Sequence, residues 1–236
     1  MVNKWSKIIQ NLVGFCKSSI GNTCYICYQT NINDAEICDT CCQWLPWLRE
    51  TCQYCAYPLV DAVLCGACLG KTHDLDHLKA LFRYESPIKQ LVLNLKFQQK
   101  LYPARLFSQY FLKYFQPNFS MDAIIAVPLA KERLKARGYN QSIEIAKELS
   151  KQLAIPLYTD VLFKERDTKS QSDLNKQQRE HNLKYTDFKL SSSFSGKRVL
   201  LIDDVYTTGT TLRCVAKQLK ACGVEYVEAW VVCRSL

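Results

Sequence analysis

The sequence has little glycine and proline and no long apolar run. With 8 glycines and 7 prolines in 236 residues, and with 48% hydrophobic and 22% charged residues, its composition is that of a globular protein. No stretch approaches the ~20 apolar residues of a membrane-spanning helix. Residues 1–21 lack the apolar run and the cleavage site of a signal peptide. We therefore expect a cytoplasmic protein without a membrane span, with one medium domain or a small domain before a larger one.

Acidic residues are fewer than basic ones. The chain has 22 Asp and Glu against 31 Lys and Arg, which gives a formal net charge of +9 and a pI near 8.9. This balance favours a polyanionic partner, either nucleic acid or a phosphorylated ligand.

Cysteine, in contrast, is abundant. Of 13 cysteines, eight between residues 24 and 68 form four Cys-x-x-Cys pairs. Each pair can aim two thiolates at one ion, and two pairs complete the tetrahedral thiolate site that zinc prefers in structural positions. Paired in sequence order, they predict a double zinc ribbon, with Cys24, Cys27, Cys38 and Cys41 at one site and Cys52, Cys55, Cys65 and Cys68 at the other.

Other interpretations of these cysteines stay open. An iron–sulfur cluster or disulfides could use the same residues, although a cytoplasmic protein keeps its thiols reduced. The pairs could also interleave, or one site could lack its metal. Cys42 falls outside the pattern and is read as a non-ligand. His73 and His77 follow cysteines that already complete both sites, so we read these two residues as linker histidines. Metal would supply folding free energy, because this segment has few aliphatic residues for a core.

Apolar residues recur at helical spacing near the N-terminus. They predict an amphipathic helix within residues 1–20, whose apolar face would pack on the protein or contact a membrane or a partner. Its apolar residues are Trp5, Ile8, Ile9, Leu12 and Val13.

The stretch Val199–Thr211 carries the strongest sign of a ligand site. Four apolar residues, Val199–Ile202, predict a strand in the middle of a parallel sheet. Asp203 and Asp204 follow at its carboxyl end, where α/β sheets bind ligands. The small residues of the next loop, before a helix predicted over 212–222, let backbone N–H groups bind an anion. The pattern indicates an acidic pair for hydroxyls or a metal beside a phosphate cradle formed by Thr207, Thr208, Gly209, Thr210 and Thr211.

A second anion-binding candidate follows another predicted buried strand, Ala123–Pro128. Four cations lie between residues 131 and 137, just before a helix predicted over 143–153. A solvated basic loop is the alternative interpretation. Lys96 and Lys100 are further candidates for phosphate contacts. The polar segment 164–183 is long for a connection, which favours an active-site lid over plain disorder.

The remaining pattern places these motifs between regular elements. A strand is predicted over 78–84, and a helix begins at Ser86 as N-cap with Pro87 in its first position. A second helix covers residues 106–114, and a last strand covers 226–232.

The motifs together resemble the ComF/GntX family of competence-associated proteins. Val199–Thr211 is similar to the phosphoribosyl-pyrophosphate signature of type I phosphoribosyltransferases, although Tyr206 stands where an aliphatic residue is usual. The wider order of motifs carries the resemblance over nearly the whole chain from Cys24 onward. Those motifs are the Cys-x-x-Cys pairs, Leu95-Lys96-Phe97, Val127-Pro128-Leu129, Arg137–Gln141, Arg166 with Thr168 and Gln171, Arg179 with Asn182, and Cys233–Leu236.

The resemblance implies an α/β fold of the type I phosphoribosyltransferase kind, a mostly parallel sheet flanked by helices, over residues 75–236, behind a zinc ribbon over 21–74. Asp203 and Asp204 would contact the ribose hydroxyls, and the 207–211 loop would hold the 5-phosphate. Residues 128–133 would lie near a magnesium-bound pyrophosphate, and 166–182 would form the lid. The remaining ligand contacts would come from Pro128, Arg133, Arg137, Asn140, Arg166, Gln171 and Arg179.

Two functions follow from the resemblance. The first is an accessory protein in natural transformation that binds phosphoribosyl pyrophosphate, single-stranded DNA and a competence helicase or other uptake proteins. The second is an active transferase that moves phosphoribose to a small nitrogen nucleophile. Val2 stands after Met1, where glutamine-dependent relatives have a catalytic cysteine, and no residue set indicates an acceptor. A purely structural zinc scaffold would leave Asp203 and Asp204 unexplained.

Overall fold

The structure is a computed structural model that describes residues 22–31, 36–164 and 187–236. The chain forms two compact units, Met1–Leu45 and Pro46–Leu236. The second group of four cysteines therefore belongs to the larger unit. The division into residues 21–74 and 75–236 stays a prediction, and the predicted helix in residues 1–20 lies outside the described residues.

The smaller unit is built around its cysteines. Strands β1 (Asn22–Thr23) and β2 (Thr30–Asn31) pair antiparallel, and helix α2 (Asp39–Gln43) follows. Cys38 is the N-cap of α2 and its side chain accepts a hydrogen bond from the Cys41 N–H.

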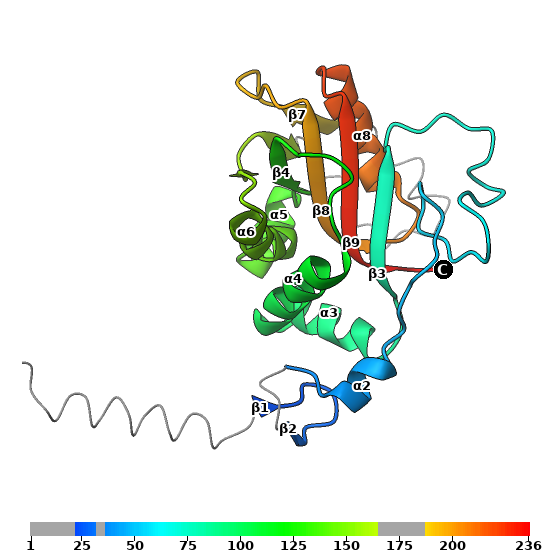
Figure 1. Cartoon of the computed structure of the whole chain (residues 1–236). Helices are drawn as coiled ribbons and strands as arrows, with labels where there is room; N and C mark the ends of the chain where they lie inside the picture. Colours follow the sequence, from blue (N-terminus) through cyan, green and yellow to red (C-terminus); the bar gives the residue numbers. More distant parts are fainter. Residues whose placement is uncertain (1–21, 32–35, 165–186) are drawn as a thin grey trace, which may run out of the picture. The chain divides into compact units, whose positions relative to one another are not determined.

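The larger unit is organised around a five-stranded parallel sheet in the order β3-β9-β8-β4-β5 (Figure 1). This confirms the predicted mostly parallel sheet flanked by helices. The strands are β3 (His77–Arg83), β4 (Ala123–Ala126), β5 (Leu157–Tyr158), β8 (Arg198–Tyr206) and β9 (Tyr226–Arg234). The helices are α3 (Ile88–Phe97), α4 (Tyr102–Tyr114), α5 (Lys131–Arg137), α6 (Gln141–Leu153) and α8 (Thr210–Ala221).

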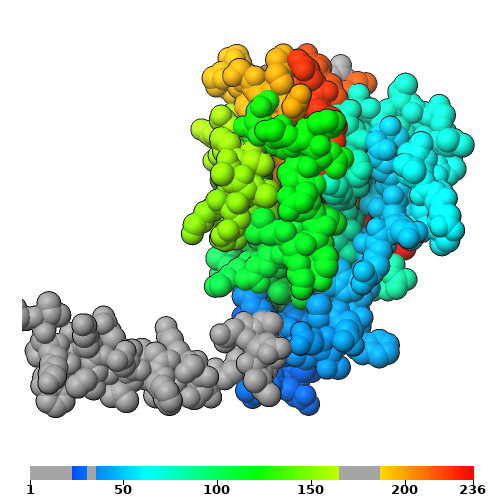
Figure 2. Space-filling model, viewed as in Figure 1, coloured from blue at the N-terminus to red at the C-terminus, as the bar shows by residue number. Residues whose placement is uncertain are grey.

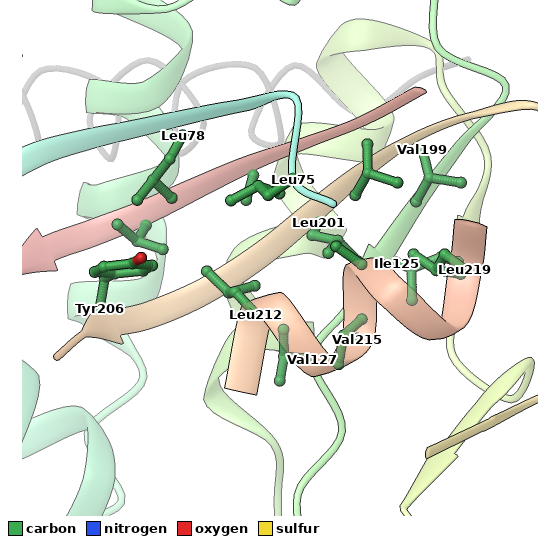
Figure 3. Packing of buried hydrophobic residues seen from close by; sticks show 14 of the residues in the cluster. Leu75, Leu78, Ile125, Val127, Val199, Leu201, Tyr206, Leu212, Val215 and Leu219 are labelled. Carbon is green, nitrogen blue, oxygen red and sulfur yellow. The ribbon is translucent and has the colours of Figure 1, made fainter. Parts of the chain in front are cut away.

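Helix α8 covers one face of the sheet. Successive side chains of a strand point to opposite faces, so Val199 and Leu201 of β8 share one face. Both belong to a buried cluster with Leu212, Val215 and Leu219 of α8, which Figure 3 shows from close by. Burial of this apolar stripe explains why a sequence with helical periodicity follows β8 directly.

Helices α4 and α6 cover the opposite face. Trp230 of β9 is fully buried there, with its ring centroid 5.8 Å from that of Phe111 on α4. Ser108 on α4 donates its hydroxyl hydrogen bond to the Ile145 carbonyl of α6 at 2.8 Å. The two helices, green and yellow-green, lie side by side in Figure 2.

A buried glutamate anchors the start of β9. Glu228 is fully buried, and its carboxylate pairs with Lys79 at 3.0 Å. It also accepts hydrogen bonds from the Trp230 indole at 2.7 Å and from the Asn118 N–H at 3.0 Å. A buried charge with this many partners is stable, because each oxygen has replaced its water contacts.

Several predicted boundaries are wrong in detail. Strand β8 continues through Asp203 to Tyr206, beyond the predicted end at Ile202. Pro87, not Ser86, is the N-cap of α3, and no side chain caps this helix. The turn before α3 is closed by the backbone instead, since the Lys89 N–H donates to the Glu85 carbonyl at 2.8 Å.

Three other features differ from the sequence prediction. The basic run expected as a loop forms α5, which ends at Gly138 with a φ of 82°. His77 is part of β3 and not of a linker. Strands β6 (Leu162–Lys164) and β7 (Phe188–Leu190), which pair antiparallel around the gap in the described residues, were not predicted. In the part of the chain that the structure describes, no helix is long and apolar enough to cross a membrane.

Candidate ligand cavity and metal centres

The carboxyl ends of β4 and β8 meet at one edge of the sheet. The two strands are neighbours and parallel, with Ala126 opposite Ile202, so the residues after them share that edge. A cavity of about 610 Å³ opens there, a size typical of ligand sites. Its wall includes these predicted site residues: Asp203, Asp204, Thr207, Thr208, Gly209, Thr210, Thr211, Pro128, Arg133 and Arg137.

The two carboxylates of β8 are held by different partners. Asp204 is buried and receives a hydrogen bond from the Gln141 amide at 2.6 Å and an ion pair from Lys96 at 2.9 Å. Asp203 is half-buried and accepts from the Ser142 hydroxyl at 3.2 Å. Helix α6 thus orients both acids through its first two residues.

Burial changes the charge state of this pair. Burial and the neighbouring charge of Asp204 raise the pKa of Asp203 from 3.8 to about 7. Burial would lower the pKa of Lys96, but the Asp204 carboxylate outweighs this effect and holds that pKa above its usual value. Near neutral pH, Asp203 can therefore bind or release a proton while Lys96 stays charged.

Lys96, Gln141 and Ser142 were missed as partners of the acids. Lys96 was predicted to contact phosphate directly, and the structure pairs it with Asp204 instead. Gln141 and Ser142 lie at the start of α6, which was predicted to begin only at residue 143. Lys100 is exposed and is not part of the cavity wall.

The loop after β8 packs closely against Tyr206 because Gly209 has no side chain. Gly209 has a φ of 76°, and a Cβ atom there would lie 2.0 Å from the Tyr206 hydroxyl oxygen. It is the N-cap of α8 and has no side chain to cap this helix; of the first helical N–H groups, that of Thr210 donates to the Thr208 hydroxyl at 3.4 Å. Those N–H groups and the positive end of the helix dipole favour an anion at this point.

Basic side chains outnumber acidic ones in the cavity wall. Among the described residues, Lys96, Arg133, Arg137 and Lys164 line it against the two aspartates. The Arg137 guanidinium donates to the Gln141 side-chain carbonyl and lies 5.3 Å from the Phe97 ring centroid. The cavity is thus suited to an anionic ligand that also carries groups for two carboxylates.

The other predicted ligand residues lie elsewhere. Asn140 is buried and is not part of the cavity wall; its amide donates to the Val127 carbonyl at 2.9 Å, and its side-chain oxygen caps α6 by accepting from the Ser142 N–H at 2.9 Å. Arg166, Gln171 and Arg179 lie outside the described residues.

The eight Cys-x-x-Cys cysteines form two groups of four thiols. In each group all sulfur atoms lie within 4.8 Å of one another, and the members are those of the sequential pairing. The Cys27 and Cys38 sulfurs are 3.9 Å apart, and the Cys55 and Cys65 sulfurs are 3.6 Å apart. A tetrahedral zinc site with Zn–S bonds of ~2.3 Å has sulfur–sulfur edges of about 3.8 Å. Both groups therefore fit structural zinc sites, and the interleaved pairing is excluded.

Backbone N–H groups around Cys24 favour the thiolate form that a metal requires. The Ile26 and Cys38 N–H groups each donate to the Cys24 sulfur at 3.4 Å. Burial works to raise the pKa of Cys24, but the N–H donors outweigh it and lower the pKa to about 6. Cys42 belongs to neither group, and His73 stacks on Tyr54 with ring centroids 4.0 Å apart.

The comparisons with known proteins agree with this geometry. A model of the phosphoribosyl transferase domain matches residues 140–236. Competence protein F of Haemophilus influenzae is 33% identical over 196 residues, which are 78% of this chain and 84% of that protein. DNA utilization protein YhgH of Escherichia coli K12 is 28% identical, covering 92% and 99% of the two chains, and competence protein ComFC of Bacillus subtilis is 27% identical, covering 81% and 82%. The chain therefore belongs to the ComF family of competence-associated proteins, and it has a phosphoribosyltransferase domain and two cysteine groups that fit zinc.

Proposed function

We propose that this protein binds phosphoribosyl pyrophosphate with magnesium in the cavity at the carboxyl end of β8. The observation that carries the proposal is one arrangement: two aspartates lie near the carboxyl end of the buried strand β8, and the loop that leads into the N-terminus of α8 follows within the same cavity. A ligand with a phosphate at one end and hydroxyls beside it matches both parts.

Each part of the ligand has a partner in the wall. The 207–211 loop and the N-terminus of α8 hold the 5-phosphate, and Asp203 and Asp204 receive the ribose hydroxyls. Pro128, Arg133 and Arg137 line the same cavity and would contact the pyrophosphate. Magnesium, when bound, would screen the charge of the pyrophosphate beside the carboxylates.

The DNA-related role belongs to the same proposal. Relatives of this chain are named as competence and DNA utilization proteins, and the net charge of +9 suits a polyanion. We infer that the protein handles single-stranded DNA during natural transformation in the cytoplasm, together with a helicase or other uptake proteins.

Calorimetry with phosphoribosyl pyrophosphate and magnesium tests the ligand assignment. The double variant Asp203→Asn/Asp204→Asn should lose measurable binding, because the two negative charges that favour the ribose hydroxyls and magnesium are gone while the volumes stay nearly unchanged. Asp160→Asn is the control, since Asp160 is exposed and lies outside the cavity wall. Unchanged affinity in the double variant would reject the assignment.

Single-stranded DNA binding is measured separately as a function of salt. The affinity should fall steeply with the logarithm of the salt concentration, because each phosphate contact releases condensed counterions. A flat salt response, or no binding at low salt, would show that the partner is not nucleic acid.

A transferase activity is the second candidate, because the cavity extends beyond the donor half. Tyr84, Leu93 and Phe97 line it on the α3 side and leave an aromatic and aliphatic wall for an acceptor. Catalysis would come from the orientation of donor and nucleophile and from charge stabilisation as pyrophosphate leaves. A pyrophosphate-release assay, with and without single-stranded DNA, distinguishes turnover from binding alone.

A further inference from the structure

We propose that Arg234 is a positioning residue that couples metal occupancy of the second cysteine group, Cys52, Cys55, Cys65 and Cys68, to ligand binding at the 207–211 loop. The proposal rests on the proposed function for the identity of the ligand. It concerns only the larger unit, which contains both sites.

One guanidinium contacts both sites. Arg234 is the last residue of β9 and lies opposite Tyr206 of β8. Its Nε donates to the Cys55 carbonyl at 3.0 Å, while its Nη1 donates to the carbonyls of Tyr206, at 3.3 Å, and Thr207. The same group lies 4.9 Å from the centroid of the Tyr206 ring.

The segments that accept hydrogen bonds from Arg234 each belong to one of the two sites. Cys55 is a member of the second cysteine group, so a bound metal fixes the backbone that accepts from Arg234. At the other end, the Tyr206 hydroxyl lies against Gly209, where a Cβ atom would approach it to 2.0 Å. The series of contacts therefore runs from the second cysteine group through Arg234 to the turn that leads into α8.

Coupling between two sites is reciprocal. If the metal stabilises the loop conformation that binds the ligand, the ligand must stabilise the metal by the same factor. Couplings of this kind are typically about 5- to 150-fold in affinity. A coupling through a single arginine should lie at the lower end of this range, so we expect the bound ligand to tighten zinc binding at the second group roughly fivefold and to slow zinc loss by up to that factor.

The first test measures zinc release from the full-length protein into a chromogenic chelator, with and without phosphoribosyl pyrophosphate and magnesium. The first cysteine group lies in the other unit and is an internal reference. Release should have two phases, and Cys27→Ser, which disables the first group, identifies the phase of the second. The ligand should slow only that phase.

Two matched variants separate coupling from general stability. Arg234→Lys keeps the charge but has one nitrogen in place of the separate Nε and Nη1 donors, so zinc should stay bound and the ligand should no longer slow its release. Arg213→Lys is the control: Arg213 donates to the Thr208 carbonyl of the same loop at 2.8 Å, and in the described part of the chain it makes no hydrogen bond to the cysteine group. In Arg213→Lys the effect of the ligand on zinc release should persist.

A ligand-independent measurement keeps the two proposals distinguishable. Chelation should raise amide hydrogen exchange at residues 207–211 in the parent and much less in Arg234→Lys, where the link is already broken. If calorimetry shows no ligand binding, the proposed function fails and this exchange result alone decides the coupling. Equal exchange changes in both proteins, or a ligand effect on zinc release that survives Arg234→Lys, would overturn the role of Arg234.

Discussion

Gly209 shows how one missing side chain defines the loop after β8. Its φ of 76° is unfavourable for other residues, and a Cβ atom would collide with Tyr206. We predict that Gly209→Ala lowers ligand affinity at least tenfold and destabilises the fold by about 1–3 kcal/mol.

The matched control is Gly138→Ala. Gly138 has a φ of 82°, but nothing lies within 4 Å of its Cβ position. Both variants carry similar backbone strain, so any excess loss in Gly209→Ala measures the close approach to Tyr206. Equal losses of affinity in calorimetry would show that Gly209 matters only for its backbone conformation.

The raised pKa of Asp203 predicts that ligand binding depends on pH. Its pKa is raised to about 7 by burial and by Asp204, so it becomes protonated as the pH falls below neutrality. A magnesium-bound ligand requires the ionised form, and we expect affinity to fall by up to about tenfold per pH unit below 7. Calorimetry between pH 6 and 8 measures this slope.

Asp203→Asn separates this effect from titration of the ligand. The phosphates of the ligand also titrate, with a pKa of about 6, and only their contribution to the pH dependence should remain in the variant. The raised pKa has the opposite effect on folding: the stabilisation from protonated Asp203 is complete below pH 3.8 and is lost as the pH rises through about 7. An unchanged slope of affinity against pH in Asp203→Asn would contradict the assignment.

Among the secondary-structure elements, α3 is tied to β8 by the ion pair between Lys96 and Asp204. Both side chains are largely buried, with 20% and 6% exposure. Lys96→Met should destabilise the fold by about 3 kcal/mol, because it leaves a buried carboxylate without its cation. Lys96→Met/Asp204→Asn should recover most of this loss, and urea unfolding measures both.

An ion pair on the surface provides the comparison for these variants. The Lys147 Nζ lies 2.8 Å from the Glu144 Oε1, but the lysine side chain is 58% exposed. Lys147→Met should therefore cost only about 0.5 kcal/mol. A loss as small as this in Lys96→Met would show that solvent screens the pair in the cavity.

The elements with a strong local pattern were predicted correctly, whereas the side-chain contacts of α3 and α6 with the two aspartates were not. The apolar residues before Asp203 and the spacing of Leu212, Val215 and Leu219 indicate a buried strand and a helix with one apolar stripe, and both are present. Strands of three residues, such as β6, are too short to show periodicity. The pairing of Lys96 with Asp204 depends on how α3 meets the sheet, which no local pattern encodes.

For the molecule as a whole, the two cysteine groups predict two zinc ions per chain. Cys41→Ser should lower the zinc content from two to one, whereas Cys42→Ser, at the next position but outside both groups, should keep two. Metal analysis of the purified proteins measures these contents. Equal zinc loss in both variants, or one zinc in the parent, would contradict the two-site assignment.

The buried carboxylate at the start of β9 also has a spectroscopic consequence. The indole N–H of Trp230 donates to Glu228 inside the larger unit, whereas Trp44 of the smaller unit is 82% exposed. A fully buried indole emits at shorter wavelengths than one in water. A variant that retains Trp230 as its only tryptophan would therefore report by fluorescence whether the sheet is intact, independently of metal loss from the smaller unit.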